Sequence, residues 1–310
     1  MFTVRIVFVA LAALSVGSGS AHGQGRGILL LAHGGSPEWN AHVTNLAATV
    51  DRTLPTEVAF GMATRANIQR AVDRLVARGA SEITAVPLFV SSSSSVITAT
   101  EYLLGQRAVA PPELAIYAKM NHSGSASGGH DAASHDAGAE HAGHAADPKT
   151  PIQSSVPIRM TRALNDHPLV ADILTSRARS ISRSAAEEAV VIVAHGPVAD
   201  DDNKRWLADM ASLAARVGQA ERFGAIDYLT LRDDAPKPVR DQATAELRAL
   251  VTKHIEAGRR VLIVPLLVSF GGIERGLRER LDGLAYALPA AGLVPDERLV
   301  EWVLAMANGR

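Results

Sequence analysis

The sequence predicts an α/β protein made of two similar parallel-sheet units in one chain, facing each other across a cleft. Short apolar runs alternate with segments of helical periodicity, which is typical of βαβ units and a parallel sheet. An apolar run ending in Ala-His-Gly occurs twice, at 32–34 and 194–196, and Val-Pro-Leu occurs twice, at 86–88 and 264–266. Two motifs repeated in the same order indicate that one structural unit is used twice.

The first unit begins with the run GILLLAH at 27–33, whose continuous apolar character predicts a strand buried on both faces. The apolar spacing over 66–80 predicts a helix, and Gly79 stands where a helix commonly ends. The same patterns predict further strands at 57–63, 82–90 and 113–119, and further helices at 38–54 and 96–106.

The second unit continues the alternation. Acidic residues open the amphipathic segment 201–218, as the positive end of a helix dipole favours, and Gly258 closes a helix over 239–258. The other expected elements are helices at 167–181 and 273–285 and strands at 189–195, 224–231 and 259–270, and residues 296–307 close the chain.

Residues 1–23 have the layout of a secretory signal peptide, with Arg5, an apolar run over 6–16 and then small residues. An uncleaved N-terminal anchor is the alternative. We therefore expect a periplasmic or secreted protein without membrane contact after cleavage. The expected organisation is a signal peptide at 1–23, a first unit at 24–120, a His-rich insert at 121–150 and a second unit at 151–310.

Composition excludes several classes of function. The chain has a net charge of −1 and 4% aromatic residues, which argues against a nucleic-acid partner. It has no cysteine, so any metal ligands must be His, carboxylate or backbone groups. No GxxxxGK[ST], GxGxxG or GxSxG pattern occurs, so neither nucleotide binding nor serine hydrolase chemistry has a sequence signal.

The repeated histidines, His33 and His195, are the first candidate site residues. Each follows an apolar strand, and ligands bind beyond the carboxyl ends of strands in open parallel sheets. The following Gly34 and Gly196 permit a sharp turn and a close approach of substrate. Imidazole binds divalent metals and accepts protons near neutral pH. The alternative is that each histidine only closes a turn through a backbone hydrogen bond.

The loops after the two Val-Pro-Leu strands are the second candidate. They contain a serine run, 91–95, and the pair Gly271 and Gly272, each just before a predicted helix. Free backbone N–H groups at such a position can bind a phosphate or carboxylate. We therefore take Ser95, Gly271 and Gly272 as candidate substrate-binding residues. A flexible connection is the alternative for the serine run.

Several segments together resemble the CbiX-type sirohydrochlorin chelatases, which need no ATP. They are LLLAHGG, TEVAFGMATRANIQRAVDRLVARGASEITAVPLFV, ALNDHPLVADIL, VIVAHG and VLIVPLLVSFGGIERGL. The resemblance implies two flavodoxin-like, chelatase-like units around a tetrapyrrole cleft. It also implies insertion of Co²⁺, or of Ni²⁺ or Fe²⁺, into a tetrapyrrole such as sirohydrochlorin, as in cobalamin synthesis. In that family the strand-end histidines, matched here by His33 and His195, bind the metal and accept pyrrole protons.

The sequence departs from the family pattern at three positions. A second family histidine falls eight residues after the strand proline, where this chain has Ser95 and Ile273. A family glutamate is matched by Met62.

The carboxylates of a macrocycle need cationic or backbone donors. Arg65, Arg205 and Arg275 are candidates for this role by position, and the alternative is that each is a solvated surface charge.

The insert is expected to be disordered, because it has almost no apolar side chain larger than alanine. Its histidines could bind Zn²⁺, Ni²⁺, Co²⁺ or Cu²⁺ weakly, with a solvated linker as the alternative. These weak candidate sites are His122, His130, His135, His141 and His144.

The sequence thus favours an exported chelatase that inserts a divalent metal, Co²⁺ first, into a tetrapyrrole without a nucleotide. A non-catalytic metal- or tetrapyrrole-binding protein on the same scaffold is the alternative, because Ser95 and Ile273 replace the second histidine. A third possibility is a structural relic that binds neither.

Overall fold

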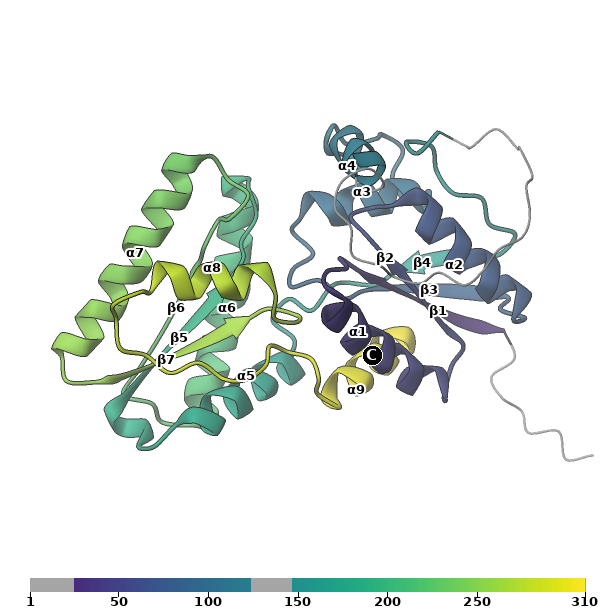
Figure 1. Cartoon of the computed structure of the whole chain (residues 1–310). Coiled ribbons are helices and arrows are strands. Elements are labelled where there is room, and N and C mark those ends of the chain that lie inside the picture. Colours follow the sequence, from purple (N-terminus) through teal and green to yellow (C-terminus); the bar gives the residue numbers. More distant parts are fainter. Residues whose placement is uncertain (1–24, 124–146, 310) are drawn as a thin grey trace, which may run out of the picture.

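The computed structural model describes residues 25–123 and 147–309 and contains two parallel sheets (Figure 1). The first sheet has the order β2-β1-β3-β4, and the second has the order β6-β5-β7. The strands of the first sheet are β1 (Arg26–Ala32), β2 (Thr56–Phe60), β3 (Glu82–Pro87) and β4 (Ile158–Met160). Those of the second are β5 (Glu188–Ala194), β6 (Ala225–Thr230) and β7 (Arg260–Leu266). The predicted fold class is confirmed.

The register of the two sheets preserves the sequence repeat. Central strand β1 pairs with β3 so that Leu31 lies opposite Pro87, and central strand β5 pairs with β7 so that Val193 lies opposite Pro265. Each Ala-His-Gly motif therefore ends the central strand of its sheet, beside the strand that carries Val-Pro-Leu. In Figure 1, β1 and β7 run from the two outer ends of the molecule toward its middle.

Helices cover both sheets, as the alternating pattern predicts. The first group comprises α1 (Pro37–Asp51), α2 (Arg65–Ala77), α3 (Ser95–Leu103) and α4 (Glu113–Ser123). The second comprises α5 (Pro168–Ile181), η1 (Ala185–Glu187), α6 (Asp200–Ala220), α7 (Lys237–Glu256), α8 (Gly272–Arg280) and α9 (Arg298–Ala307). The N-terminus of α1 is capped by Ser36, whose hydroxyl accepts a hydrogen bond from the Trp39 amide at 3.2 Å.

The strand expected at 113–119 is wrong: these residues belong to α4. Leu114, Tyr117 and Ala118 are buried, and their spacing of three and four residues is that of one helix face. Pro111 and Pro112 precede the helix, where proline is tolerated. The short β4 was not expected, because three residues carry too little periodicity to signal a strand.

Two elements cross between the units. β4 extends the first sheet, with Ala85 opposite Met160, and α9 packs against α1 and β3. Figure 1 shows α9, late in the sequence, lying beside α1. Both elements follow residue 151, so the two sheets do not divide the chain at that position.

A single buried apolar cluster runs through both units. It joins Leu30 and Val86 of the first sheet, Ile192 and Val264 of the second, and Trp302 of α9. Close packing of this kind resists relative movement of the parts it joins. The two units therefore present their strand ends to each other in a fixed arrangement.

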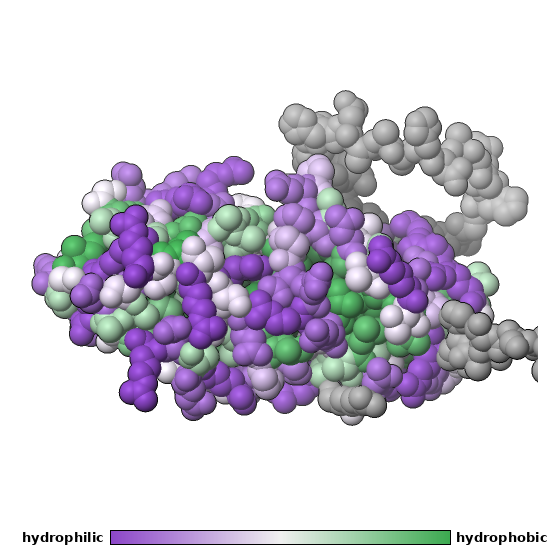
Figure 2. Space-filling model, turned by 90° about the horizontal axis from the view of Figure 1, so that it is seen from below, coloured by the Kyte–Doolittle hydropathy of each residue, from purple (hydrophilic) through white to green (hydrophobic). Residues whose placement is uncertain are grey.

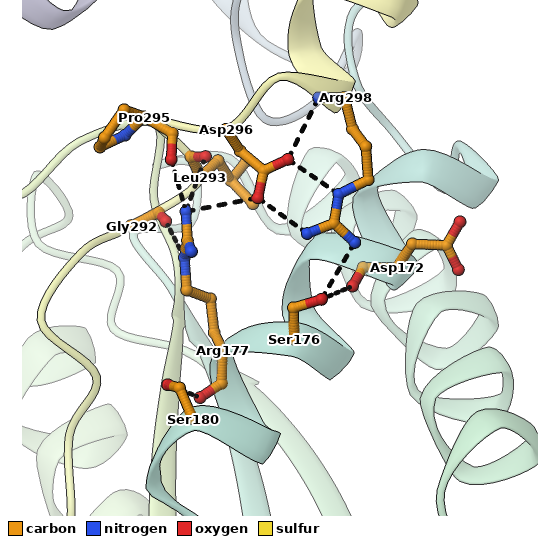
Figure 3. Close-up of polar contacts among 9 residues, drawn as sticks. All are labelled: Asp172, Ser176, Arg177, Ser180, Gly292, Leu293, Pro295, Asp296 and Arg298. Carbon is orange, nitrogen blue, oxygen red and sulfur yellow. Dashed lines mark hydrogen bonds and ion pairs between the residues drawn. The ribbon is translucent and has the colours of Figure 1, made fainter.

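Polar contacts fix the segment that leads into α9 (Figure 3). Arg177 of α5 donates to the carbonyl oxygens of Gly292 and Pro295 at 2.7 and 2.9 Å. Arg298 donates to the Asp296 carboxylate at 2.8 Å and to the Ser176 hydroxyl at 3.0 Å. Burial raises the pKa of the Asp296 carboxyl, but the hydrogen bonds and charge of Arg298 outweigh burial and hold this pKa below its usual range.

On the side shown in Figure 2, the surface has no large continuous area of one hydropathy. Apolar residues appear there as separate areas between hydrophilic side chains. Within residues 25–123 and 147–309, no helix has the length and apolar character needed to cross a bilayer.

Candidate functional site

His33 and His195 occupy equivalent places, one residue beyond the central strands β1 and β5. The glycine after each has a left-handed backbone, with φ of +82° at Gly34 and +77° at Gly196. A Cβ at Gly196 would lie 2.6 Å from the Cβ of Thr230 at the end of β6, so only glycine fits. The predicted position of both histidines at strand ends is confirmed.

The two histidines differ in their surroundings. His33 is exposed, and its Nδ1 lies 2.7 Å from the Gly34 carbonyl oxygen. His195 is largely covered, with 25% of its side chain exposed, and its Nε2 lies 3.1 Å from Oδ2 of Asp234. The duplicated motif thus gives one open imidazole and one imidazole paired with a carboxylate.

Asp234, in the loop after β6, links the two histidines. The hydrogen bond from His195 lowers the pKa of the Asp234 carboxyl most, and the charges that His195 and His33 carry when protonated lower it further. His33 therefore lies within electrostatic range of Asp234, although it belongs to the other unit.

Sequence reasoning missed Asp234. It considered an acidic residue only at the position of Met62. The available signal was the pair Asp233 and Asp234 just past β6, because polar residues beyond a parallel strand lie at the ligand-binding edge. Asp233 is used differently, since it forms an ion pair with Arg280.

Ser95 begins α3, and its hydroxyl is engaged by a tyrosine. The Ser95 Oγ lies 2.5 Å from the Tyr117 Oη of α4. Burial raises the pKa of Tyr117 most, and the Asp234 carboxylate raises it further. The Ser95 hydroxyl is therefore already engaged within the first unit. The other position of the missing histidine, Ile273, packs against the apolar core of the second unit.

The rest of the serine run is an anchored junction between the units. The Ser92 hydroxyl donates to Oδ1 of Asn165 at 2.8 Å, and the Trp206 indole of α6 donates to the Ser93 carbonyl at 2.7 Å. Ser91 is buried, and its hydroxyl donates to Asp209 at 3.4 Å. These contacts with Asn165 and with α6 argue against the flexible connection considered for this run.

Gly271 and Gly272 stand at the start of α8, with open space where a Cβ would be at either position. The loop that carries them also reaches the first unit, since Oγ of Ser269 lies 3.1 Å from Nδ1 of His42 on α1. Their contact with a substrate stays a prediction.

The three candidate arginines have different partners. Arg65 donates to the Thr150 carbonyl at 2.9 Å, and Arg205 pairs with Asp202 one turn away on α6 at 3.0 Å. The Arg275 side chain is exposed on α8 and makes no hydrogen bond or ion pair with the described part of the chain. Arg275 alone is therefore available for an anionic substrate.

No group of three or more His, Asp or Glu side chains with metal-binding geometry occurs in the described ranges 25–123 and 147–309. His130, His135, His141 and His144 lie outside these ranges, as do the side chain of His122 and the predicted signal peptide. The two recorded surface hollows, of about 490 and 790 Å³, are not lined by His33 or His195.

The comparison with protein families decides the assignment. The CbiX model matches residues 27–181, which is 155 of the 310 residues and thus half of the chain. The chain belongs to the CbiX family. The match includes β1, His33 and the serine run, and it ends with α5.

Solved structures agree with this CbiX fold. SirB from Bacillus subtilis with Fe³⁺ has a TM-score of 0.59 at 15% identity, over 92% of this chain and 94% of that one. The sirohydrochlorin chelatase SirB in complex with cobalt, from Bacillus subtilis subspecies spizizenii, has a TM-score of 0.55 at 14% identity, over the same shares. A multi-domain protein of Deinococcus radiodurans with structural similarity to chelatases has a TM-score of 0.51 at 18% identity, over 92% of this chain and 54% of that one. No curated protein matches the sequence.

Proposed function

We propose that this CbiX-family protein inserts a divalent metal ion into a sirohydrochlorin-type tetrapyrrole without ATP, with Co²⁺ as the first metal to test and Fe²⁺ and Ni²⁺ next. The observation that carries the proposal is the 3.1 Å pair of His195 and Asp234 at one strand end, with His33 exposed at the equivalent strand end of the other unit. The SirB structures with Fe³⁺ and with cobalt support a metal as substrate.

The chemistry requires one divalent cation to enter the macrocycle and two pyrrole N–H protons to leave. His195 is suited to accept these protons one after the other and pass them to solvent, because its side chain is 25% exposed and its Nε2 lies 3.1 Å from the Asp234 carboxylate, which leaves Nδ1 as the ring nitrogen that can accept a proton. Asp234 orients the ring and keeps its negative charge, since its pKa is lowered.

His33 is suited to hold the incoming metal. Its Nδ1 faces the Gly34 carbonyl oxygen, so an N–H there donates to the carbonyl and the Nε2 lone pair is left for a cation. The ring is exposed and has no carboxylate partner among the described residues. Val198, 52% exposed in the loop after His195, offers apolar surface to a flat macrocycle.

The test is anaerobic incubation of the mature protein with sirohydrochlorin and Co²⁺, followed by absorbance. Wild type is expected to exceed the spontaneous rate, and His33→Ala with His195→Ala is expected to return it to that rate. A sample lacking residues 121–150 reports whether the His-rich insert contributes to metal supply. A rate of metal insertion no higher than that of the protein-free blank would refute the proposed chelatase activity.

A binding protein is the second candidate, favoured by Ser95 and Ile273 at the positions of the missing histidine. It predicts a shifted tetrapyrrole spectrum without metal insertion. If the tetrapyrrole spectrum does not change at all, the remaining possibility is a structural relic that binds neither metal nor tetrapyrrole.

We also propose that residues 1–23 direct export to the periplasm or outside the cell. N-terminal sequencing of the protein from the periplasmic or secreted fraction tests this. A mature chain that still begins at Met1 would contradict cleavage.

A further inference from the structure

Arg232 has an unusual conformation and position. It lies in the loop after β6, two residues before Asp234, and is only 8% exposed. Its backbone has φ of +55°, a left-handed conformation that a residue with a long side chain adopts only when its surroundings hold it there. The contacts of Arg232 explain this conformation.

Arg232 binds the loop that follows His195 at four points. Its amide donates to the His195 carbonyl oxygen at 2.8 Å, and its Nε donates to the Pro197 carbonyl oxygen at 2.7 Å. Its Nη2 donates to the Val198 carbonyl oxygen and, at 2.8 Å, to Oδ1 of Asp200 at the start of α6. One residue thus spans the loop, with its amide at the strand end and its guanidinium on residues 197, 198 and 200.

Arg232 and Asp234 belong to the same loop, the one that follows β6. Arg232 therefore connects both partners of the 3.1 Å contact between His195 and Asp234. Because Val198 is exposed, packing holds the loop only weakly, and the guanidinium contacts replace that packing.

The first unit has no counterpart of this clamp in the described residues. There the loop after His33 is held by its own helix, because the Gly35 amide donates to Oδ1 of Asn40 at 2.9 Å. The position that corresponds to Arg232 is Met62, because Phe60 lies opposite Ala32 as Thr230 lies opposite Ala194. The clamp therefore belongs to the half that has the carboxylate-paired histidine.

We propose that Arg232 is a positioning residue, which sets the orientation of His195 toward Asp234 and thus the efficiency of proton removal from the macrocycle. The inference rests on the proposed function. It requires an arginine, because the planar fork reaches two carbonyls and a carboxylate at once, whereas a lysine offers one point charge.

The experiment compares Arg232→Met and Arg232→Lys with wild type. Both variants keep a long side chain at the same left-handed position, so the comparison isolates the guanidinium. Arg179→Met is the matched control, because Arg179 also binds a carboxylate, Glu221 at 2.9 Å, and a carbonyl, Ala220 at 2.8 Å, away from the strand ends.

Arg232→Met is expected to lower kcat by about 100-fold with little change in KM, since misplacing a reacting group has an effect of that order. Arg232→Lys is expected to fall between wild type and Arg232→Met. In a His195→Ala background, Arg232→Met is expected to cause no further loss. Amide exchange at residues 231 and 232, which donate to the Ala194 and His195 carbonyls, is expected to accelerate.

Two results would overturn the inference while the enzyme proposal survives. One is wild-type kcat in Arg232→Met, and the other is a loss of activity in Arg232→Met that adds fully to that of His195→Ala, since a purely structural role acts regardless of His195. If wild type inserts no metal, the enzyme proposal fails by itself. Unchanged amide exchange at residues 231 and 232 in Arg232→Met would then refute the clamp independently.

Discussion

Nε2 of His195 and Oδ2 of Asp234 lie 3.1 Å apart, whereas His33 at the equivalent strand end contacts only the carbonyl oxygen of the next residue. The duplicated motif has therefore diverged in its partners and not in its backbone position. The proposed division of labour between proton removal and metal binding depends on this difference.

Asp234→Asn should separate the two roles. The amide keeps the size of the side chain but removes the negative charge that faces Nε2 of His195, so metal insertion is expected to fall about 10- to 100-fold. Steady-state insertion rates measure the effect. Asp241→Asn is the matched control, since Asp241 is an exposed carboxylate paired with Lys237 on α7. Equal rates in wild type and Asp234→Asn would contradict the role of Asp234.

Gly196→Ala should destabilise the protein more than Gly34→Ala. Both positions have a positive φ, so the backbone strain is shared, but the new Cβ at 196 would meet the Thr230 Cβ at 2.6 Å and the one at 34 would meet the Phe60 Cβ at 3.4 Å. The additional loss at Gly196 is expected to be about 1–3 kcal/mol of the free energy of unfolding. Urea denaturation of both variants measures it, and equal losses would argue against the steric reason.

The segment before α9 should make the stability of the folded protein fall at low pH. The pKa of the Asp296 carboxyl is lowered in the folded protein, so its contribution is complete above the ordinary aspartate pKa of about 3.9 and is lost as pH falls through the lower folded value. Melting temperatures between pH 5 and pH 2 should show this loss in wild type. In Asp296→Asn the fall below about pH 4 should be smaller. Parallel curves for the two proteins would contradict the ion pair's contribution.

Trp302→Ala should test the cluster that joins the units. Trp302 is fully buried on α9, and truncating a buried tryptophan removes about 3–5 kcal/mol from the free energy of unfolding. Denaturation followed by circular dichroism gives the value. A loss below about 1 kcal/mol would mean that α9 is not part of the cooperative core.

The repeated elements were predictable because their signals are local. Continuous apolar runs define the strands, and Gly79 and Gly258 mark the ends of helices whose apolar spacing is regular. The α4 error has a local cause too, since ELAIYAK has the apolar content of a strand and is long enough for only about two helical turns. Short segments of this kind are decided by the contacts they make later.

The site could be predicted only in part. Both strand-end histidines follow from the parallel-sheet rule, but the link from Asp234 to His195 depends on how the β6 loop folds back over the β5 loop. Arg232 holds that arrangement, and neither its spacing nor its residue type reveals this in the sequence. The placement of α9 on the first unit was equally hidden, because an amphipathic helix does not say which of two similar sheets it will cover.

The crossing of α9 has a consequence for biosynthesis. The first sheet is synthesised early, but the apolar side of α1 and β3 lacks its cover until residues 298–307 have left the ribosome. A nascent or truncated chain would therefore present that surface to chaperones and proteases, even though every strand of the first sheet has been made. Folding of the first unit is therefore expected to depend on synthesis of α9, and a product that ends before Arg298 is expected to be cleared instead of persisting as a folded first unit.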